Sequence, residues 1–81
     1  TAMDLNLKQI LTDIARAIVD TPDAVRVEET VDGDDVELVL SVAEDDTGMV
    51  IGRHGKIAKA IRQIMKVAAA KAGKHVNVEI K

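Results

Sequence analysis

The chain has 81 residues, no cysteine, no aromatic residue and a formal net charge of −3. This length indicates one small domain with a single core, and the lack of cysteine excludes disulfides, zinc-finger spacing and thiol nucleophiles. No segment resembles a membrane span or a signal peptide, so we expect a soluble, cytoplasmic domain over residues 3–81. We interpret Thr1 and Ala2, which precede Met3, as the remnant of a cleaved tag.

Charge is divided unevenly along the chain. Residues 1–46 carry 3 basic and 13 acidic side chains, a net charge of −10, whereas residues 47–81 carry 8 basic and 1 acidic side chain, a net charge of +7. Because binding of a polyanion depends on the local field rather than on the net charge, the second half is where such a partner would bind.

The first predicted element is an amphipathic helix near the amino terminus. Its apolar residues recur at intervals of three and four, as on the buried stripe of a helix, at Leu7, Ile10, Leu11, Ile14, Ala15 and Ile18. Either Asp4 or Asn6 is placed to cap this helix. Pro22, within a turn at residues 20–23, is predicted to end it.

Two strands joined by a tight turn are predicted next. In the first, polar residues alternate with Val25, Val27 and Val31, although Glu29 interrupts the apolar face. The second alternates more cleanly, with its apolar face at Val36, Leu38, Leu40 and Val42. Residues 32–35, Asp-Gly-Asp-Asp, predict the hairpin turn between them.

Two helices and a final strand complete the prediction. Residues 44–47 offer capping side chains for a short helix at residues 48–51, which leads into the loop Gly52-Arg53-His54-Gly55. A long helix follows, with a predicted core face at Ile57, Ile61, Ile64, Met65, Ala68 and Ala72. Its opposite, cationic face contains Lys56, Lys59, Arg62 and Lys66. Gly73 is placed to end this helix, and residues 75–80 alternate as a strand.

The glycine loop has two interpretations. A loop that closes onto a helix start presents unpaired N–H groups and the positive end of the helix dipole, and glycines let a phosphodiester approach the backbone closely. Two glycines three positions apart also occur in ordinary helix–helix turns. The surrounding basic half of the chain favours the phosphate-binding interpretation.

The residues do not indicate an enzyme. A nucleotide-binding P-loop needs four residues between its glycines and then Lys-Ser or Lys-Thr, whereas here two residues intervene and Ile57 follows Lys56. The only serine, Ser41, and the only histidines, His54 and His75, form no nucleophile–base set. The acidic clusters lack the spacing of a calcium loop. We therefore expect no catalysis, cofactor, metal or small-molecule substrate.

The predicted order, with Val50-Ile51-Gly52-Arg53-His54-Gly55-Lys56-Ile57 between its adjacent helices, resembles the K-homology (KH) domain in its type II arrangement. The resemblance implies an α+β fold of order α-β-β-α-α-β, with a three-stranded sheet packed on one side by helices. Within KH domains, the acidic loop at residues 43–48, the segment 57–62 and the alanine-rich segment 67–71 are similar to the KhpA family of small bacterial proteins.

What the resemblance implies is binding of single-stranded RNA, or of single-stranded DNA, in a groove between the glycine loop and an edge of the sheet. The residues implied to contact it are Gly52, Arg53, His54, Gly55, Lys56 and Lys59, with Val50, Ile51 and Ile57 on the groove floor. A core position is the alternative for the last three. For Arg62 and Lys66, an ordinary solvated helix surface is the alternative.

Without Phe, Tyr or Trp, RNA-recognition motifs and aromatic oligonucleotide-binding barrels are excluded, and a single copy is expected to bind weakly. The KhpA resemblance implies a homodimer or a heteromer with KhpB, also called Jag or EloR, acting as an RNA chaperone or post-transcriptional regulator in cell elongation and cell-wall homeostasis. The pairing surface is either the alanine-rich helix end or an exposed edge strand. The competing hypothesis is a protein-interaction module whose basic face docks an acidic partner, with the glycine loop only a turn.

Overall fold

The computed structural model describes residues 6–81, so the predictions made for Thr1, Ala2 and Asp4 lie outside the described residues. Its helices and strands are α1 (Leu7–Ile18), β1 (Arg26–Asp32), β2 (Asp35–Ser41), α2 (Thr47–Ile51), α3 (Lys56–Lys71) and β3 (His75–Ile80). Single 3-10 turns lie at Pro22–Ala24, Glu44–Asp46 and Arg53–Gly55. The predicted α+β order is confirmed. Within residues 6–81, no helix has the length and hydrophobicity needed to cross a membrane.

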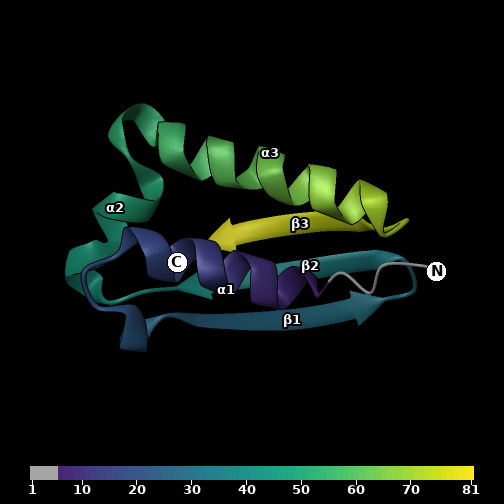
Figure 1. Cartoon of the computed structure of the whole chain (residues 1–81), viewed down its shortest axis with the longest axis horizontal. Helices are drawn as coiled ribbons and strands as arrows, with labels where there is room; N and C mark the ends of the chain where they lie inside the picture. Colours follow the sequence, from purple (N-terminus) through teal and green to yellow (C-terminus); the bar gives the residue numbers. More distant parts are fainter. Residues whose placement is uncertain (1–5) are drawn as a thin grey trace.

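The sheet is mixed, with strand order β1-β2-β3. β1 and β2 pair antiparallel, and Asp32 opposite Asp35 leaves a two-residue turn in which Gly33 has a φ of 61°. This confirms the predicted hairpin. β3 pairs parallel with β2, so α2, the glycine loop and α3 together form the crossover between them. Figure 1 shows α1 and α3 on the same face of the sheet, with the glycine loop at one end.

The core lies between this face of the sheet and the helices. Its most completely buried side chains are Leu11, Leu38, Leu40, Met65 and Val50. Along β2, buried Val36, Leu38 and Leu40 alternate with exposed or half-buried residues, as the sequence predicted. On β1 the prediction fails at Val31, which is exposed. Val31 sits beside the hairpin turn, where the apolar packing around Val25 and Val27 does not reach.

The first helix begins with the predicted cap and ends earlier than predicted. The Asn6 side chain accepts a hydrogen bond from the Gln9 N–H at 3.1 Å. The helix stops at Ile18, four positions before Pro22, because Val19 adopts an extended conformation and buries its side chain. Pro22 instead begins the following 3-10 turn, a position that suits its fixed φ.

The buried face of α3 differs from the prediction. Its buried residues are Ala58, Ile61, Met65 and Ala69, and the predicted Ala68 is partly buried against the core. Ile57 and Ile64, predicted to be buried, are 37% and 52% exposed. Each precedes a buried residue by one position, which places it about 100° away around the helix. Ile57, Ile64 and Val67 remain as an exposed apolar stripe.

The carboxyl end of α3 has the predicted glycine cap. Gly73 has a φ of 70°, and its N–H donates to the Ala70 carbonyl at 3.1 Å. The next N–H, of Lys74, donates to the Ala69 carbonyl at 2.8 Å. These two bonds form a Schellman motif, which turns the chain back from α3 into β3.

The corrected orientation of α3 can be tested with two adjacent substitutions. Met65→Ala should lower the free energy of unfolding by about 2–5 kcal/mol, because it leaves a cavity in the core. Ile64→Ala should change it by less than about 0.5 kcal/mol, because that side chain is half exposed. Urea denaturation, at protein concentrations where the chain is monomeric, measures both. Equal losses for the two variants would contradict this orientation.

Candidate nucleic-acid interface

The glycine loop is a short, hydrogen-bonded connection between two helices. The Gly52 N–H closes α2 by donating to the Gly48 carbonyl at 2.8 Å. The Gly55 N–H then donates to the Gly52 carbonyl at 3.1 Å, which forms a 3-10 turn, and α3 begins at Lys56. Its position at the end of the domain is visible between α2 and α3 in Figure 1.

Three of the four loop residues have a positive φ. Gly52 has φ 74° and ψ 173°, a combination that is essentially restricted to glycine. His54 (φ 57°, ψ 24°) and Gly55 (φ 73°, ψ 16°) both lie in the left-handed helical region. His54 is the only non-glycine residue with a positive φ among residues 6–81. Such strain is concentrated at functional sites, although histidine tolerates this region better than most residues.

Gly52 and Gly55 differ in the space around their Cβ positions. A Cβ atom at Gly52 would lie 2.6 Å from Cγ1 of Ile57, so the Ile57 side chain packs against the bare backbone there. A Cβ atom at Gly55 would meet nothing within 4 Å. Gly52 therefore fixes the loop against α3, whereas Gly55 leaves the start of α3 open to a ligand.

The start of α3 has the properties of an anion site. No side chain caps it at Gly55, and its first turn contains no acidic residue. The Lys56 N–H donates to the Arg53 carbonyl within the 3-10 turn, whereas N–H groups in the first turn of a helix otherwise lack intrahelical partners, and the helix dipole adds positive potential at this end. The side chains of Arg53, His54, Lys56 and Lys59 are all exposed around it. Residues 6–81 contain no group of three or more His, Cys, Asp or Glu side chains that could hold a metal ion.

The three aliphatic candidates beside the loop separate into two kinds. Val50 is fully buried in the core, which agrees with the core alternative and leaves it no surface for a ligand. Ile51 and Ile57 are each 37% exposed, so the core alternative is wrong for both. Ile51 directly precedes the glycine loop, and Ile57 lies two positions after it.

Arg62 makes a contact that the sequence did not reveal. Its Nε donates to the Val78 carbonyl of β3 at 3.1 Å. On α3, Lys59, Arg62 and Lys66 follow at intervals of three and four, so they share one side of the helix, here named the basic flank. Through Arg62 this flank is held beside β3.

β3 is an edge strand, and its outer backbone groups face the basic flank. The His75 N–H donates to the Asp34 carbonyl and the Lys81 N–H donates to the Leu40 carbonyl, each at 2.9 Å. Because hydrogen-bonding direction alternates along a strand, Val76, Val78 and Ile80 turn their N–H and C=O groups toward the free edge. Arg62 uses one of these carbonyls.

Asp46 is a buried carboxylate that sequence analysis missed. It is 2% exposed, and its Oδ2 accepts the Thr21 N–H at 2.9 Å. Although Asp46 occupies the position before α2, its side chain makes no capping bond there, contrary to the capping role predicted for this segment. It instead ties the connection after α1 to the start of α2. In the run Glu44-Asp45-Asp46, nothing in the sequence distinguishes the buried carboxylate from its exposed neighbours.

Comparison with known proteins gives consistent matches over most of the chain. The family model described as KhpA/KhpB, KH domain, matches residues 8–80. The protein named RNA-binding protein KhpA from Clostridium acetobutylicum is 50% identical over 74 residues, which cover 91% of this chain and 99% of that protein. RNA-binding protein KhpA from Bacillus subtilis is 39% identical over 77 residues, 95% of each chain.

A solved structure has a similar fold within a larger protein. Era, in complex with MgGDPNP and nucleotides of 16S ribosomal RNA, superimposes with a TM-score of 0.60 at 22% sequence identity. The match covers 95% of this chain but only 31% of the Era chain. At this identity the similarity concerns the fold alone.

The different roles of the two loop glycines predict different costs of substitution. Gly52→Ala should destabilise the protein by about 2–4 kcal/mol, because the new methyl group both strains the backbone and displaces Ile57. Gly55→Ala should cost about 1 kcal/mol, the lower end of the penalty for a left-handed residue in open space. Thermal and urea unfolding measure both values.

Gly48→Ala is the matched control. Gly48 lies within α2, has an ordinary φ and has open space around its Cβ position, so alanine there should be neutral or slightly stabilising. A Gly52→Ala variant as stable as Gly55→Ala would contradict the packing of Ile57 against the loop.

Proposed function

The chain belongs to the KhpA/KhpB family of KH domains, and from this premise we propose that it binds single-stranded RNA through the glycine loop and the start of α3. The observation that carries the proposal is the uncapped amino end of α3, open at Gly55 and flanked by Arg53, His54 and Lys56. This arrangement suits the binding of a phosphodiester and offers no catalytic set.

In the proposed complex, different groups contact different parts of the nucleotide. Backbone N–H groups at the loop and the exposed side chains of Arg53, His54 and Lys56 contact phosphates, and Lys59 extends the positive field along α3. The exposed surfaces of Ile51 and Ile57 contact bases. Free backbone N–H and C=O groups at the edge of β3 donate hydrogen bonds to base edges and accept hydrogen bonds from them. These contacts do not require a 2′-hydroxyl group, so single-stranded DNA should also bind.

Because the chain has no Phe, Tyr or Trp for stacking, one copy should bind weakly, and we propose that it pairs with a second copy. Of the earlier candidates, the alanine-rich end of α3 is partly used by the fold, since Ala69 is buried. The exposed apolar stripe offers Ile64 and Val67 instead. In a symmetric dimer, the two-fold axis would place the stripe of one copy against the same stripe of the other copy.

We also propose the wider role that the family resemblance implies. In the cytoplasm, the chain would act as an RNA chaperone or post-transcriptional regulator, alone or with a KhpB-type protein, in cell elongation and cell-wall homeostasis. The alternative is a protein-interaction module whose basic face docks an acidic protein. The exposed, positively charged loop is compatible with both, so the ligand must be tested directly.

RNA binding can be tested with a double charge reversal in the loop. Arg53→Asp combined with His54→Asp should abolish binding of a labelled single-stranded RNA in fluorescence anisotropy, because both side chains are exposed beside the phosphate site. Wild-type binding should weaken with salt, with a log–log slope of about −2 if about three phosphates are contacted. Circular dichroism should show that the variant remains folded.

The matched control is Lys8→Asp combined with Arg16→Asp. These two exposed cations lie on α1, away from the glycine loop, and the change in net charge is nearly the same. This control should retain most of the RNA affinity. Equal loss in both variants would indicate a non-specific charge effect, and salt-insensitive or absent binding by the wild type would favour the protein-docking alternative.

Pairing can be tested separately at the apolar stripe. Ile64→Asp should convert a dimer into a monomer in sedimentation velocity, because it buries a charge at the symmetric interface. Val31→Asp places the same charge on an exposed valine of β1 and should leave the dimer intact. A dimer that survives Ile64→Asp, or a wild-type protein that is monomeric at high concentration, would rule out this surface.

A further inference from the structure

A hollow lies at the opposite end of α3 from the glycine loop. It encloses about 520 Å³ and is lined by Lys66, Ala69, Ala70, Gly73, Lys74, His75 and Val76. This volume lies within the range of about 300–1,000 Å³ that small-ligand pockets occupy. The Schellman turn at Gly73 creates the space, because it sends the chain sharply from α3 into β3.

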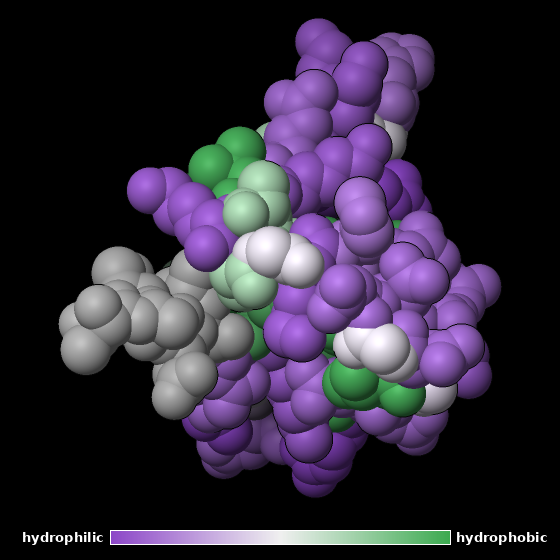
Figure 2. All heavy atoms as spheres, turned by 90° about the vertical axis from the view of Figure 1, so that its right-hand side faces the viewer, coloured by the Kyte–Doolittle hydropathy of each residue, from purple (hydrophilic) through white to green (hydrophobic). Residues whose placement is uncertain are grey.

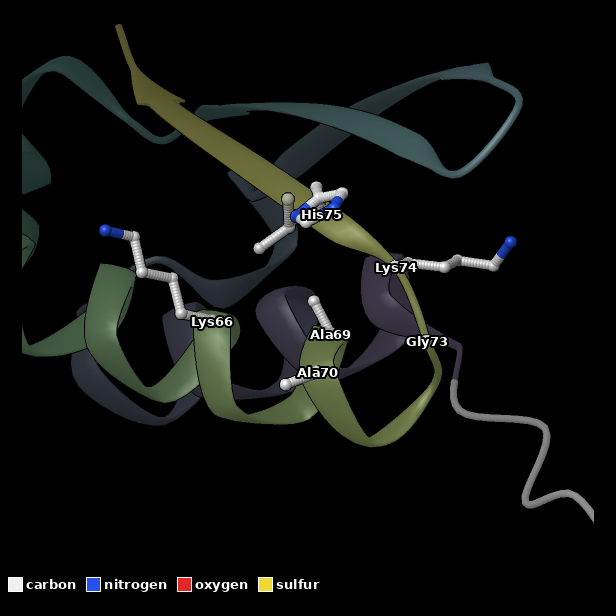
Figure 3. Close-up of a pocket in the computed structure, with 7 residues that line it drawn as sticks. Lys66, Ala69, Ala70, Gly73, Lys74 and His75 are labelled. Atoms are coloured by element: carbon white, nitrogen blue, oxygen red, sulfur yellow. The ribbon is translucent and has the colours of Figure 1, made fainter.

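The walls of this hollow combine an apolar floor with a cationic rim. The floor consists of half-buried Val76 together with exposed Ala70 and Gly73, whereas Ala69 is itself buried, and the rim includes the exposed side chains of Lys66 and His75. Figure 3 shows the Ala69 methyl group directed into the space between α3 and β3, with Lys66 extended beside it and Lys74 directed away. Around this end of the molecule the surface is mainly hydrophilic, with small hydrophobic areas (Figure 2). An apolar floor beside one cation suits a nucleobase with its phosphate better than a free anion.

The hollow is connected to the loop site by the basic flank. Lys66 is the last residue of the series Lys59, Arg62, Lys66, and Arg62 holds this side of α3 to β3. The 13 positions from Lys56 to Ala69 correspond to about 20 Å along a helix. One positively charged path therefore leads from the glycine loop to the hollow.

The strand edge and the hairpin constrain how a nucleotide would lie. Val76 turns its backbone N–H and C=O groups toward the free edge of β3, where the edge of a base can pair with them. On the other side of β3, His75 is opposite Asp35, and its N–H donates to the Asp34 carbonyl. The carboxylates of this hairpin repel phosphate. The sugar–phosphate chain is therefore directed to the Lys66 side and the base to the floor.

We propose that this hollow is a further nucleotide site on the same single strand, with a base over half-buried Val76 and a phosphate at Lys66. This inference rests on the proposed RNA binding at the glycine loop. A KH loop clamps four nucleotides. A tetranucleotide engaged at the loop therefore leaves no nucleotide for the hollow, whereas a decanucleotide can occupy both sites.

The test compares two lengths of oligouridylate, of four and ten nucleotides, against three proteins. A decamer offers the loop several binding registers, which alone raises its apparent affinity above that of the tetramer. Wild type should bind the decamer more tightly than this statistical effect accounts for. Lys66→Gln should weaken decamer binding roughly threefold at low salt and reduce the salt slope by about 0.7, the contribution of one phosphate, without affecting the tetramer. Lys71→Gln removes the same charge from an exposed residue of α3 that does not line the hollow, and should change neither affinity.

A second measurement locates the contact. In amide NMR spectra, the decamer should shift the signals of Gly73 and Val76, whereas the tetramer should shift only signals at the glycine loop. If wild type binds neither oligonucleotide, the proposed function itself fails. If the decamer leaves Gly73 and Val76 unshifted, or if Lys66→Gln weakens both lengths equally, RNA binding at the loop stands and the additional site is overturned.

Discussion

The parallel pairing of β3 with β2 is the constraint on which the rest of this structure depends. Two neighbouring parallel strands cannot be joined by a tight turn, so the chain must leave the sheet at one end and return at the other. Here residues 42–74 form this connection, which contains α2, the glycine loop and α3. The same requirement covers the core with α3, places the loop at the end of the sheet and leaves β3 as an edge beside the basic flank.

This topology converts the uneven charge of the sequence into two chemically different surfaces. The acidic half of the chain forms α1 and the β1–β2 hairpin, and exposed Glu28 and Glu37 lie on the sheet face that no described helix covers. The basic half forms the crossover. A polyanion is therefore attracted to one side of the domain and repelled from the other, which explains how a chain of net charge −3 can present a positive site.

Local patterns predicted the features that depend on local physics. The element order, the hairpin at Gly33, the Asn6 cap and the glycine end of α3 all follow from periodicity, turn chemistry or capping. The sequence could not predict the features that depend on contacts between distant residues. The rotation of α3 was misjudged because two of its buried residues, Ala58 and Ala69, are alanines, and alanine carries little hydrophobic signal. Asp46 and Arg62 were missed because their partners, Thr21 and Val78, are 25 and 16 positions away.

The backbone of the glycine loop has a consequence for the thermodynamics of binding. Gly52 is confined by the Ile57 side chain, and both ends of the loop are hydrogen-bonded into helices. A flexible loop would lose about 1–2 kcal/mol of conformational entropy for each residue that a ligand orders. A loop already held in one conformation avoids most of this loss, so even a few weak contacts are converted efficiently into affinity. In the proposed RNA complex, preorganisation of the backbone would partly compensate for the absence of Phe, Tyr and Trp.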